Sequence, residues 1–362
     1  MVDARDAAMM ARARFLAERG RGTTSPNPIV GAVVVDRDGV IVGQGAHRQA
    51  GGPHAEVVAL DEAGARARGA TLYVTLEPCC HTGRTGPCAA RIVSDGIARV
   101  VLAVRDPNPR VDGGGVRFLR AHGVEVVEGV GEEEARYQNA PFFTWMARKR
   151  PHVTLKAAVS ADGFVGRPGQ RVQITGAEAR RYFHRERAEV DAIAVGAGTV
   201  VTDDPWLTAR GAWRARPLVR VLFDWSLRIR PSARVFSTLA EGPVIMMVSR
   251  AATEARPDAV IALERRGVSI ERRDDRALGP MLRWLAARDV VSLLIEGGPT
   301  LQQAFWEAGA VDRSQVVVAP TVLGDGLPIA AGFGGEHGWR RRDPVRQLGA
   351  DRFIEWDVHG TD

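Results

Sequence analysis

The alternation of β-branched runs with helix-like segments is the feature that most constrains the fold of this chain. The helix-like residues 4–18 precede two strand-like runs, residues 29–36 and 40–45, which flank an Asp-Gly turn typical of a hairpin. Further strands are predicted at residues 71–76 and 99–104, with helical stretches around them. Strands that alternate with helices predict layered α/β domains.

A break in this alternation predicts two domains. The 362 residues are too many for one ordinary core of roughly 100–200 residues. At residues 148–151, basic side chains followed by proline are typical of a helix end. We therefore expect an α/β domain over residues 1–147 and a second one over residues 151–362.

The remaining elements can be assigned from the same patterns. In the first domain we expect helices at residues 54–68, 89–95 and 132–147 and a strand at residues 124–127. In the second, we expect strands at residues 152–159, 192–195, 218–223, 244–248, 290–295 and 315–319. Its expected helices cover residues 177–189, 279–287 and 299–308.

The charge of the chain does not predict a polyanionic partner. The formal net charge is +6, but only two of the 49 basic residues are lysines, and the arginines are spread without a long block. Nucleic-acid binding needs clustered basic residues. No apolar stretch approaches the roughly 18–20 residues of a membrane span, and residues 1–20 lack the apolar run of a signal peptide. We therefore expect a cytoplasmic protein without a membrane or nucleic-acid partner.

The three cysteines, Cys79, Cys80 and Cys88, lie within ten positions of one another. In a cytosolic chain such a cluster indicates a metal or catalytic site rather than a disulfide framework. With His54, the thiolates of Cys79 and Cys88 make a three-ligand zinc set that leaves a fourth position for water, whose pKa zinc lowers to about 7. Glu56 is suited to carry the water proton to a ring nitrogen and the leaving amine.

This combination of H-x-E with P-C is the signature of zinc-dependent base deaminases, although the Cys-x8-Cys spacing is longer than usual. Two points stay open on the residues alone. Cys80 and His81 are chemically able to bind zinc, and we favour Cys79 because both Cys79 and Cys88 follow a proline. Asn27, in a proline-rich segment, is either a plain turn residue or a hydrogen-bonding partner of the base.

Two glycine-rich turns in the second domain suit phosphate binding. Residues 196–199 (GAGT) lack the third glycine of a dinucleotide fingerprint, and such a loop alone is more often a turn than a site. Residues 296–300 (EGGPT) are better suited, because Pro299 fits the first turn of a helix whose N–H groups attract phosphate. A simple β–α turn explains this segment equally well.

Longer motifs carry a resemblance to one family. In the first domain they are residues 25–31 (SPNPIVG), 52–56 (GPHAE) and 75–88 (TLEPCCHTGRTGPC); in the second, residues 155–163, 174–176, 195–210 and 295–301. Over nearly its whole length the chain resembles the bifunctional riboflavin-biosynthesis deaminase/reductase family. The resemblance implies a fold of class α/β, with a cytidine-deaminase-like α/β/α layer domain followed by a dihydrofolate-reductase-like α/β domain.

The resemblance also implies the chemistry. In this family the first domain hydrolyses the 2-amino group of a diaminopyrimidinone that carries a phosphoribosylamino chain, and the second reduces the ribosyl chain to ribityl with NADPH. The implied cofactors are Zn²⁺ and NADPH, and the implied partner is a small pyrimidine ribosyl phosphate. His54, Cys79 and Cys88 match the zinc ligands, and Glu56 matches the catalytic proton shuttle.

The other site residues follow from the motif match, position by position. Deaminase substrate contacts match Asn27, His81, Arg84 and Thr85. Reductase substrate contacts match Arg171, Arg187, Leu207, Arg210 and Glu296. NADPH contacts match Ala158, Thr199, Asp203, Trp225, Gly298, Pro299, Thr300 and Leu301.

Among these, Asp203 and Glu296 are expected to deliver protons, and Arg187 and Arg210 are expected to clamp the substrate phosphate. Two departures from the family pattern bear on packing around the nicotinamide. Residues 170–173 (QRVQ) replace a common S-x-W, and Trp225 stands where a serine is common.

Two rival hypotheses are kept. A tRNA or single-stranded nucleic-acid deaminase with an appended RNA-binding domain needs a basic face and aromatic stacking residues, for which the sequence gives no signal. A deaminase regulated by a nucleotide-sensing second domain would bind NADPH without turnover. The sequence leaves the oligomeric state open, with a homo-oligomer among the options.

Overall fold

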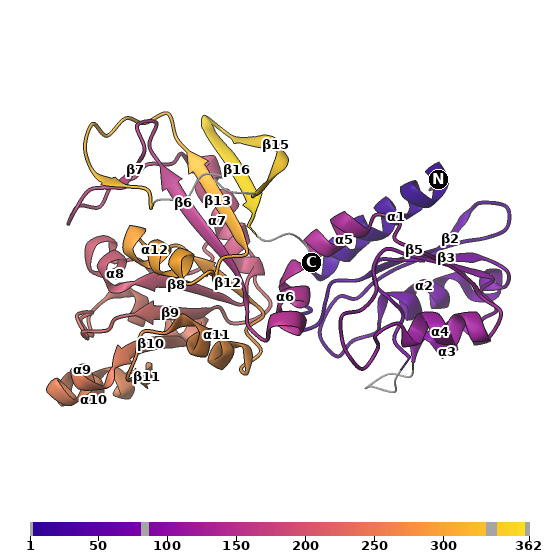
Figure 1. Ribbon diagram of the computed structural model, residues 1–362, viewed down its shortest axis with the longest axis horizontal. Helices are drawn as coiled ribbons and strands as arrows, with labels where there is room; N and C mark the ends of the chain where they lie inside the picture. The colour runs from indigo at the N-terminus through magenta and orange to yellow at the C-terminus, as the bar shows by residue number, and fades with distance from the viewer. Residues whose placement is uncertain (1–2, 81–86, 331–338, 359–362) are drawn as a thin grey trace. The chain divides into compact units, whose positions relative to one another are not determined.

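The structure is a computed structural model that describes residues 3–80, 87–330 and 339–358. The chain divides into two compact units, one up to Lys149 and the other from Arg150 onward (Figure 1). Each unit contains its own β-sheet. Among the described residues, no helix combines the length and apolar character needed to cross a bilayer.

The first unit contains a five-stranded sheet in the order β2-β1-β3-β4-β5. β1 pairs antiparallel with β2 and β3, whereas β3, β4 and β5 pair parallel. The strands are β1 (Gly31–Val35), β2 (Ile41–Ala46), β3 (Thr71–Val74), β4 (Arg99–Leu102) and β5 (Glu125–Glu128). The α-helices are α1 (Ala4–Ala17), α2 (Ala55–Ala63), α3 (Cys88–Ser94), α4 (Gly114–Ala121), α5 (Glu132–Gln138) and α6 (Ala140–Arg148).

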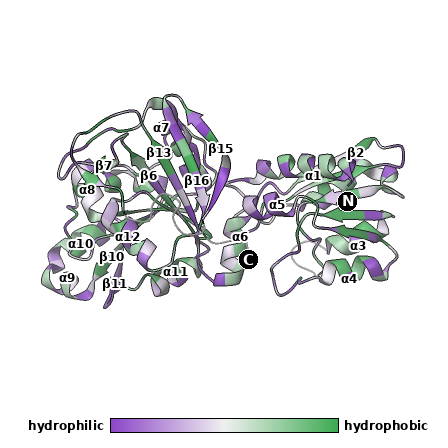
Figure 2. Ribbon diagram, turned by 45° about the horizontal axis from the view of Figure 1, so that its top comes forward, coloured by the Kyte–Doolittle hydropathy of each residue, from purple (hydrophilic) through white to green (hydrophobic). Residues whose placement is uncertain are grey.

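Helices cover both faces of this sheet (Figure 1). α1 packs on β1, and α5 lies beside α1, where the Gln138 amide donates to the Arg14 carbonyl. α2, α3 and α4 follow one another on the opposite face. Apolar residues line the strands between the two helix layers (Figure 2). The α/β/α layering predicted for the first domain is therefore confirmed.

The second unit contains a nine-stranded sheet in the order β11-β10-β9-β8-β12-β6-β13-β16-β15 and a small sheet of β14 and β7. The strands are β6 (His152–Val159), β7 (Phe164–Gly166), β8 (Ala192–Gly196), β9 (Val219–Phe223), β10 (Val244–Ser249), β11 (Ser269–Arg273), β12 (Ser292–Ile295), β13 (Arg313–Val318), β14 (Leu327–Pro328), β15 (Arg340–Leu348) and β16 (Asp351–Asp357). The α-helices are α7 (Ala177–Glu189), α8 (Ala197–Asp203), α9 (Arg250–Ala255), α10 (Pro257–Arg265), α11 (Leu278–Ala286) and α12 (Pro299–Glu307).

Seven neighbouring strands of the large sheet, from β11 to β13, pair parallel. β16 and β15 complete the sheet with antiparallel pairs. Parallel strands end at a common edge, so the segments that follow β8, β9, β10 and β12 lie along one edge of the sheet. β12 comes later in the chain than β8 but lies between β8 and β6, and ligands of α/β sheets bind at such a reversal of strand order.

Most predicted elements are present within a few residues, and several were missed. The predicted hairpin is confirmed as β1 and β2, with Gly39 in the turn at φ +87°. The helix predicted over residues 132–147 is instead two helices, α5 and α6, which meet at Asn139. The α-helices and strands that the sequence missed are α4, β7, α8, α9, α10, β11, β14, β15 and β16.

The junction at Asn139 anchors the segment that leads into β1. Asn139 is 3% exposed, and its side-chain oxygen accepts the Ile29 N–H at 2.9 Å. Its side-chain amide donates to the Ile29 carbonyl, also at 2.9 Å. A buried side chain thus replaces the strand partner that Ile29 lacks.

Asn139→Ala is expected to destabilise the first unit by about 2–4 kcal/mol, because both backbone groups of Ile29 lose a buried partner. Hydrogen exchange of the β1 amides measures this loss. Gln44→Ala, which removes an exposed hydrogen bond with Arg12, is the control in the same unit. A loss no larger than that of Gln44→Ala would contradict the anchoring role.

Candidate active sites

Three metal-binding side chains meet in the first unit. His54 immediately precedes α2, Cys79 follows β3, and Cys88 opens α3. The His54 Nδ1 atom lies 3.2 Å from the Cys88 sulfur and 3.7 Å from the Cys79 sulfur. All three ligand atoms lie within 4.8 Å of one another. Nitrogen and sulfur ligands of a tetrahedral zinc are about 3.5–3.8 Å apart, so the set fits this ion.

The electrostatics of the two sulfurs favour metal binding. Hydrogen bonds from the Cys88 thiol and from His54 lower the pKa of Cys79 to about 4, although burial opposes this shift. The bond to Cys79 and burial raise the pKa of the Cys88 thiol. Zinc ligands are thiolates, so a zinc ion bound here would release the proton that Cys88 retains.

Glu56 lies in the first turn of α2 and is 4% exposed. Burial raises the pKa of its carboxyl group to about 7, while the charge of His54 acts in the opposite direction. The carboxyl group also contacts the Cys88 thiol, which places it beside the metal-binding cluster. A carboxyl group with a pKa near neutrality can both accept and return a proton.

A histidine that the sequence did not single out holds Asn27. His47 is buried, and burial lowers its pKa, so the ring is neutral near pH 7. Its Nδ1–H donates to the Pro53 carbonyl at 3.0 Å, which leaves Nε2 to accept the Asn27 amide at 3.3 Å. The His47 ring also packs edge-on against His54, with centroids 5.5 Å apart.

The Glu77 carboxylate, the acidic group of the cysteine loop over residues 75–88, is structural. It is buried and accepts the N–H groups of Asp106, Gly113 and Val116 at 3.1–3.3 Å. Glu77 thereby fixes the segment after β4 beside Pro78. The backbones approach so closely there that a Cβ atom added at Gly115 would lie 2.0 Å from the Pro78 carbonyl oxygen.

Not every residue of this loop joins the cluster. The Cys80 sulfur lies against Gly114 in α4, where an added Cβ atom would approach it to 2.6 Å. Cys80 is absent from the group of close metal-binding atoms formed within the described ranges. The predicted substrate contacts His81, Arg84 and Thr85 lie outside the described residues.

In the second unit, the two glycine-rich turns touch each other. The Gly298 N–H, just before α12, donates to the Thr199 hydroxyl of α8 at 3.2 Å. A Cβ atom at Gly297 would lie 2.7 Å from the Leu301 side chain and 3.4 Å from the Gly196 nitrogen. A side chain there would displace Leu301, whereas the two glycines leave bare backbone along this part of the edge, which suits a pyrophosphate.

Gln302, which the sequence did not single out, fixes this turn from behind. Its side chain is 2% exposed and donates to the Gly297 carbonyl at 2.9 Å and to the Lys156 carbonyl at 3.3 Å. Lys156 lies on β6, two residues before the predicted NADPH contact Ala158. The amide of Gln302 therefore ties β6 to the start of α12, where Pro299 and Thr300 lie.

A buried ion pair joins two predicted residues. Arg187 binds Glu296 through two bonds of 2.6 and 2.7 Å, and the Lys156 ammonium lies 4.0 Å from the same carboxylate. Burial raises the pKa of Glu296, but Arg187 and Lys156 outweigh it and lower the pKa to about 2. Burial also lowers the pKa of Lys156.

Arg210 lies where several cations converge. Its guanidinium is 4.7 Å from the centroid of the Trp206 ring, and Arg234 is 4.5 Å from the same centroid. Burial lowers the pKa of Arg210, and the charges of Arg187, Arg171 and Arg234 lower it further. Such a gathering of positive charge favours a bound anion.

The structure also places three further predicted residues of the second unit. Asp203 ends α8, and burial raises its pKa while Arg171 opposes the shift. Leu207 is buried in an apolar cluster with a positive φ of 55°, so its side chain serves the core. Trp225 lies further along the sheet edge, after β9.

Comparison with known proteins identifies the family. A family model described as the RibD C-terminal domain matches residues 151–341, and one described as the cytidine and deoxycytidylate deaminase zinc-binding region matches residues 3–104. The riboflavin biosynthesis protein RibD of Aquifex aeolicus is 42% identical over 354 residues, which cover 95% of this chain and 96% of that protein. The chain belongs to the RibD family.

Solved RibD structures resemble the whole chain. The RibD of Acinetobacter baumannii matches with a TM-score of 0.84 at 36% identity, over 98% of both chains. A deaminase/reductase of Thermotoga maritima matches with a TM-score of 0.83 at 35% identity, also over 98% of both chains. The predicted fold class and the predicted bifunctional RibD enzyme, a zinc-dependent deaminase joined to an NADPH-dependent reductase of riboflavin biosynthesis, are confirmed.

We expect Cys80→Ser to keep one zinc ion per chain and Cys79→Ser to lose it, because the Cys79 sulfur lies beside His54 while the Cys80 sulfur lies against Gly114. Metal content measured by elemental analysis after dialysis checks this pair of variants. Loss of zinc in Cys80→Ser with retention in Cys79→Ser would show that Cys80, and not Cys79, is the zinc ligand.

Proposed function

We propose that the first domain, residues 1–147, deaminates 2,5-diamino-6-(5-phosphoribosylamino)pyrimidin-4(3H)-one, and that the second, residues 151–362, reduces the ribosyl chain of the product with NADPH. The observation that carries this proposal is the buried Glu56 carboxyl group beside the cluster of His54, Cys79 and Cys88. The similar protein of Thermotoga maritima is a diaminohydroxyphosphoribosylaminopyrimidine deaminase and 5-amino-6-(5-phosphoribosylamino)uracil reductase, which supports the same pair of activities here.

In the deaminase site, His54, Cys79 and Cys88 would hold zinc, which supplies an attacking water of lowered pKa. Glu56 takes a proton from that water and delivers it to a ring nitrogen, and then helps to protonate the leaving amino group. Water replaces the 2-amino group by oxygen, and ammonia leaves. Asn27, oriented by neutral His47, hydrogen-bonds the pyrimidine.

In the reductase site, NADPH supplies the hydride. The turns after β8 and β12 would hold its pyrophosphate through backbone N–H groups. Asp203, whose pKa burial raises, is the group to which we assign proton delivery, whereas Arg187 and Lys156 keep Glu296 ionised. Glu296 also orients Arg187, since both of its oxygens bind that guanidinium.

The substrate phosphate is assigned to the arginines of the second unit. Arg187 already shares two N–H groups with Glu296. No ion pair within the described residues engages Arg210, whose guanidinium lies among Arg171, Arg187 and Arg234. Arg210 is therefore the stronger candidate for a direct phosphate contact, with Arg171 and Arg187 in support.

This local gathering of arginines around Arg210 suits a small phosphorylated pyrimidine better than a nucleic acid, which needs an extended basic surface. Three points stay predictions: that no nucleic acid binds the protein, that it is cytoplasmic, and that it forms a homo-oligomer.

A coupled assay tests the two activities together. The full chain is given the diaminopyrimidinone phosphate and NADPH, and ammonia release and NADPH loss are recorded in the same sample. We expect ammonia first and then one NADPH oxidised per ammonia. Ammonia without NADPH loss would contradict the reductase half of the proposal.

Glu56→Gln is expected to retain zinc but to lose deamination by roughly 10²–10⁴-fold, because glutamine cannot carry a proton. Glu62→Gln, an exposed change on the same helix, is the matched control. Ammonia release and bound zinc are measured for both, and reduction of supplied deaminated product should be unchanged. Near-normal ammonia release by Glu56→Gln would refute the shuttle role.

Arg210→Ala is expected to weaken substrate binding by about 10–150-fold, the value of a charged hydrogen bond, with NADPH affinity unchanged. Arg210→Lys should recover part of the loss, because an ammonium lacks the bidentate fork. The measurement is KM for the phosphorylated and a dephosphorylated substrate. Equal effects of Arg210→Ala on the KM of both substrates would show that another residue contacts the phosphate.

A further inference from the structure

Beyond the glycine turns, the same edge of the large sheet carries an aromatic ring in a fixed position. Trp225 follows β9, and in the pairing of β8 with β9 Gly196 lies opposite Phe223, two residues before it. The Trp225 carbonyl accepts both the Ser249 N–H at 3.3 Å and the Ser249 hydroxyl at 2.7 Å. Its half-buried indole lies 6.3 Å from the Phe223 ring centroid. The ring is thus held just past the Gly196 turn.

An exposed cation lies beside this ring. Arg276 belongs to the segment between β11 and α11, and its guanidinium is 5.7 Å from the Trp225 ring centroid. This contact is longer than the one between Arg288 and Trp284, where the guanidinium lies 3.6 Å from the ring centroid. A base can therefore occupy the face of Trp225 while the Arg276 side chain moves to a group next to it.

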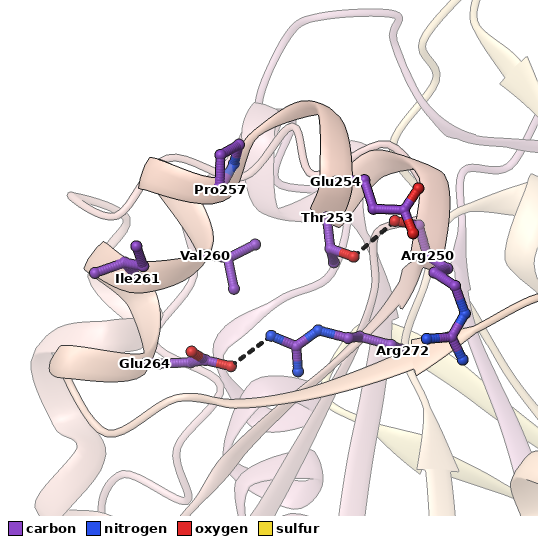
Figure 3. Close-up of a pocket in the computed structure, with 8 residues that line it drawn as sticks. All are labelled: Arg250, Thr253, Glu254, Pro257, Val260, Ile261, Glu264 and Arg272. Carbon is purple, nitrogen blue, oxygen red and sulfur yellow. Dashed lines mark hydrogen bonds and ion pairs between the residues drawn. The ribbon is translucent and has the colours of Figure 1, made fainter.

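Arg276 differs from the other arginines of this edge. Arg250 is paired with Asp274 at 2.7 Å, and Arg272 is paired with Glu264 at 2.8 Å across the surface hollow between α9, α10 and β11 (Figure 3). In the part of the chain that the structure describes, no ion pair engages Arg276. Its positive charge is available to an anion, whereas the hollow in Figure 3 offers only paired arginines.

The direction of the dinucleotide follows from the strand order. Its pyrophosphate lies at the turns after β8 and β12 in the proposed function. The reacting end of the dinucleotide belongs beside Lys156 on β6 and Glu296 after β12, on the β6 side of these turns. The other end must then extend over β9, about 10 Å and two strand spacings from β12. That distance brings an adenosine to Trp225.

We propose that Trp225 stacks on the adenine of the dinucleotide and that Arg276 binds its 2′-phosphate, so that this pair makes the reductase prefer NADPH to NADH. The inference rests on the proposed reductase function. Aromatic side chains stack on any base, and a guanidinium forms charge-assisted bonds with a phosphate. The adenine is common to both dinucleotides, and the 2′-phosphate is found only in NADPH. The two residues therefore have separable effects.

Binding to the full chain is measured by calorimetry with four probes: NADP⁺, NAD⁺, 2′,5′-ADP and 5′-ADP. Arg276→Ala is expected to weaken NADP⁺ and 2′,5′-ADP by about 10–150-fold and to leave NAD⁺ and 5′-ADP unchanged. Trp225→Ala is expected to weaken all four probes by a similar factor, about 5–150-fold, and Trp225→Phe to recover most of it.

Arg250→Ala is the matched control, because it removes an exposed arginine of the same edge that is already paired with Asp274. It should leave all four affinities unchanged. Equal weakening of NADP⁺ and NAD⁺ by Arg276→Ala, or the same selective loss in Arg250→Ala, would overturn the assignment. So would a wild type that binds NADP⁺ and NAD⁺ equally well.

Turnover separates this inference from the function on which it rests. Arg276→Ala should keep the wild-type kcat at saturating NADPH and show a raised KM for NADPH alone. A wild type that binds NADP⁺ selectively through Arg276 but never oxidises NADPH would overturn the proposed reductase and leave the recognition intact. Normal turnover with an unchanged NADPH-to-NADH preference in Arg276→Ala would overturn the recognition and leave the reductase intact.

Discussion

The parallel pairing of neighbouring strands is the constraint on which both sites depend. In the first unit, β3 and β4 run parallel, so the cysteine loop after β3 and the segment after β4 end side by side, where the Glu77 carboxylate joins them. In the second unit, the parallel pairs of β12 with β8 and β6 bring the turns at Gly196 and Gly298 into contact with each other. Residues more than 90 positions apart thus share one sheet edge.

Buried carboxyl groups at the two sites differ because of their neighbours. Glu56 is buried with little opposing charge, and burial raises its pKa to about 7. The Glu296 side chain is also largely buried, but Arg187 and Lys156 reverse the effect of burial and lower its pKa to about 2. The same type of side chain is therefore suited to proton transfer in one unit and is held ionised beside its cations in the other.

The sequence predicted what depends on local pattern and missed what depends on tertiary contact. The predicted strands have β-branched runs, whereas α4 begins within the glycines 113–115 and β15 is rich in arginine, so neither of these two elements has a clear local signal. The zinc cluster was predictable because its residues have motif spacing. His47 and Glu77 were not, since their roles arise from hydrogen bonds to Asn27 and to backbone groups distant in sequence. Asn139 likewise looks like an ordinary helix residue until its bonds to Ile29 are seen.

In the proposed function, the pairing of Arg187 with Glu296 would link phosphate recognition to the reacting end of the reductase site. Arg214 donates to the backbone carbonyls of Arg187 and Ala188 at 2.8 and 2.9 Å, so the last turn of α7 is held in place. Only the side chain of Arg187 is then able to turn toward an incoming phosphate. If one of the two N–H groups bound to Glu296 turned to the phosphate, the ion pair would weaken and the pKa of Glu296 would rise. In the proposed function, substrate binding would thereby bring the pKa of Glu296 closer to the range in which the carboxyl group can exchange a proton.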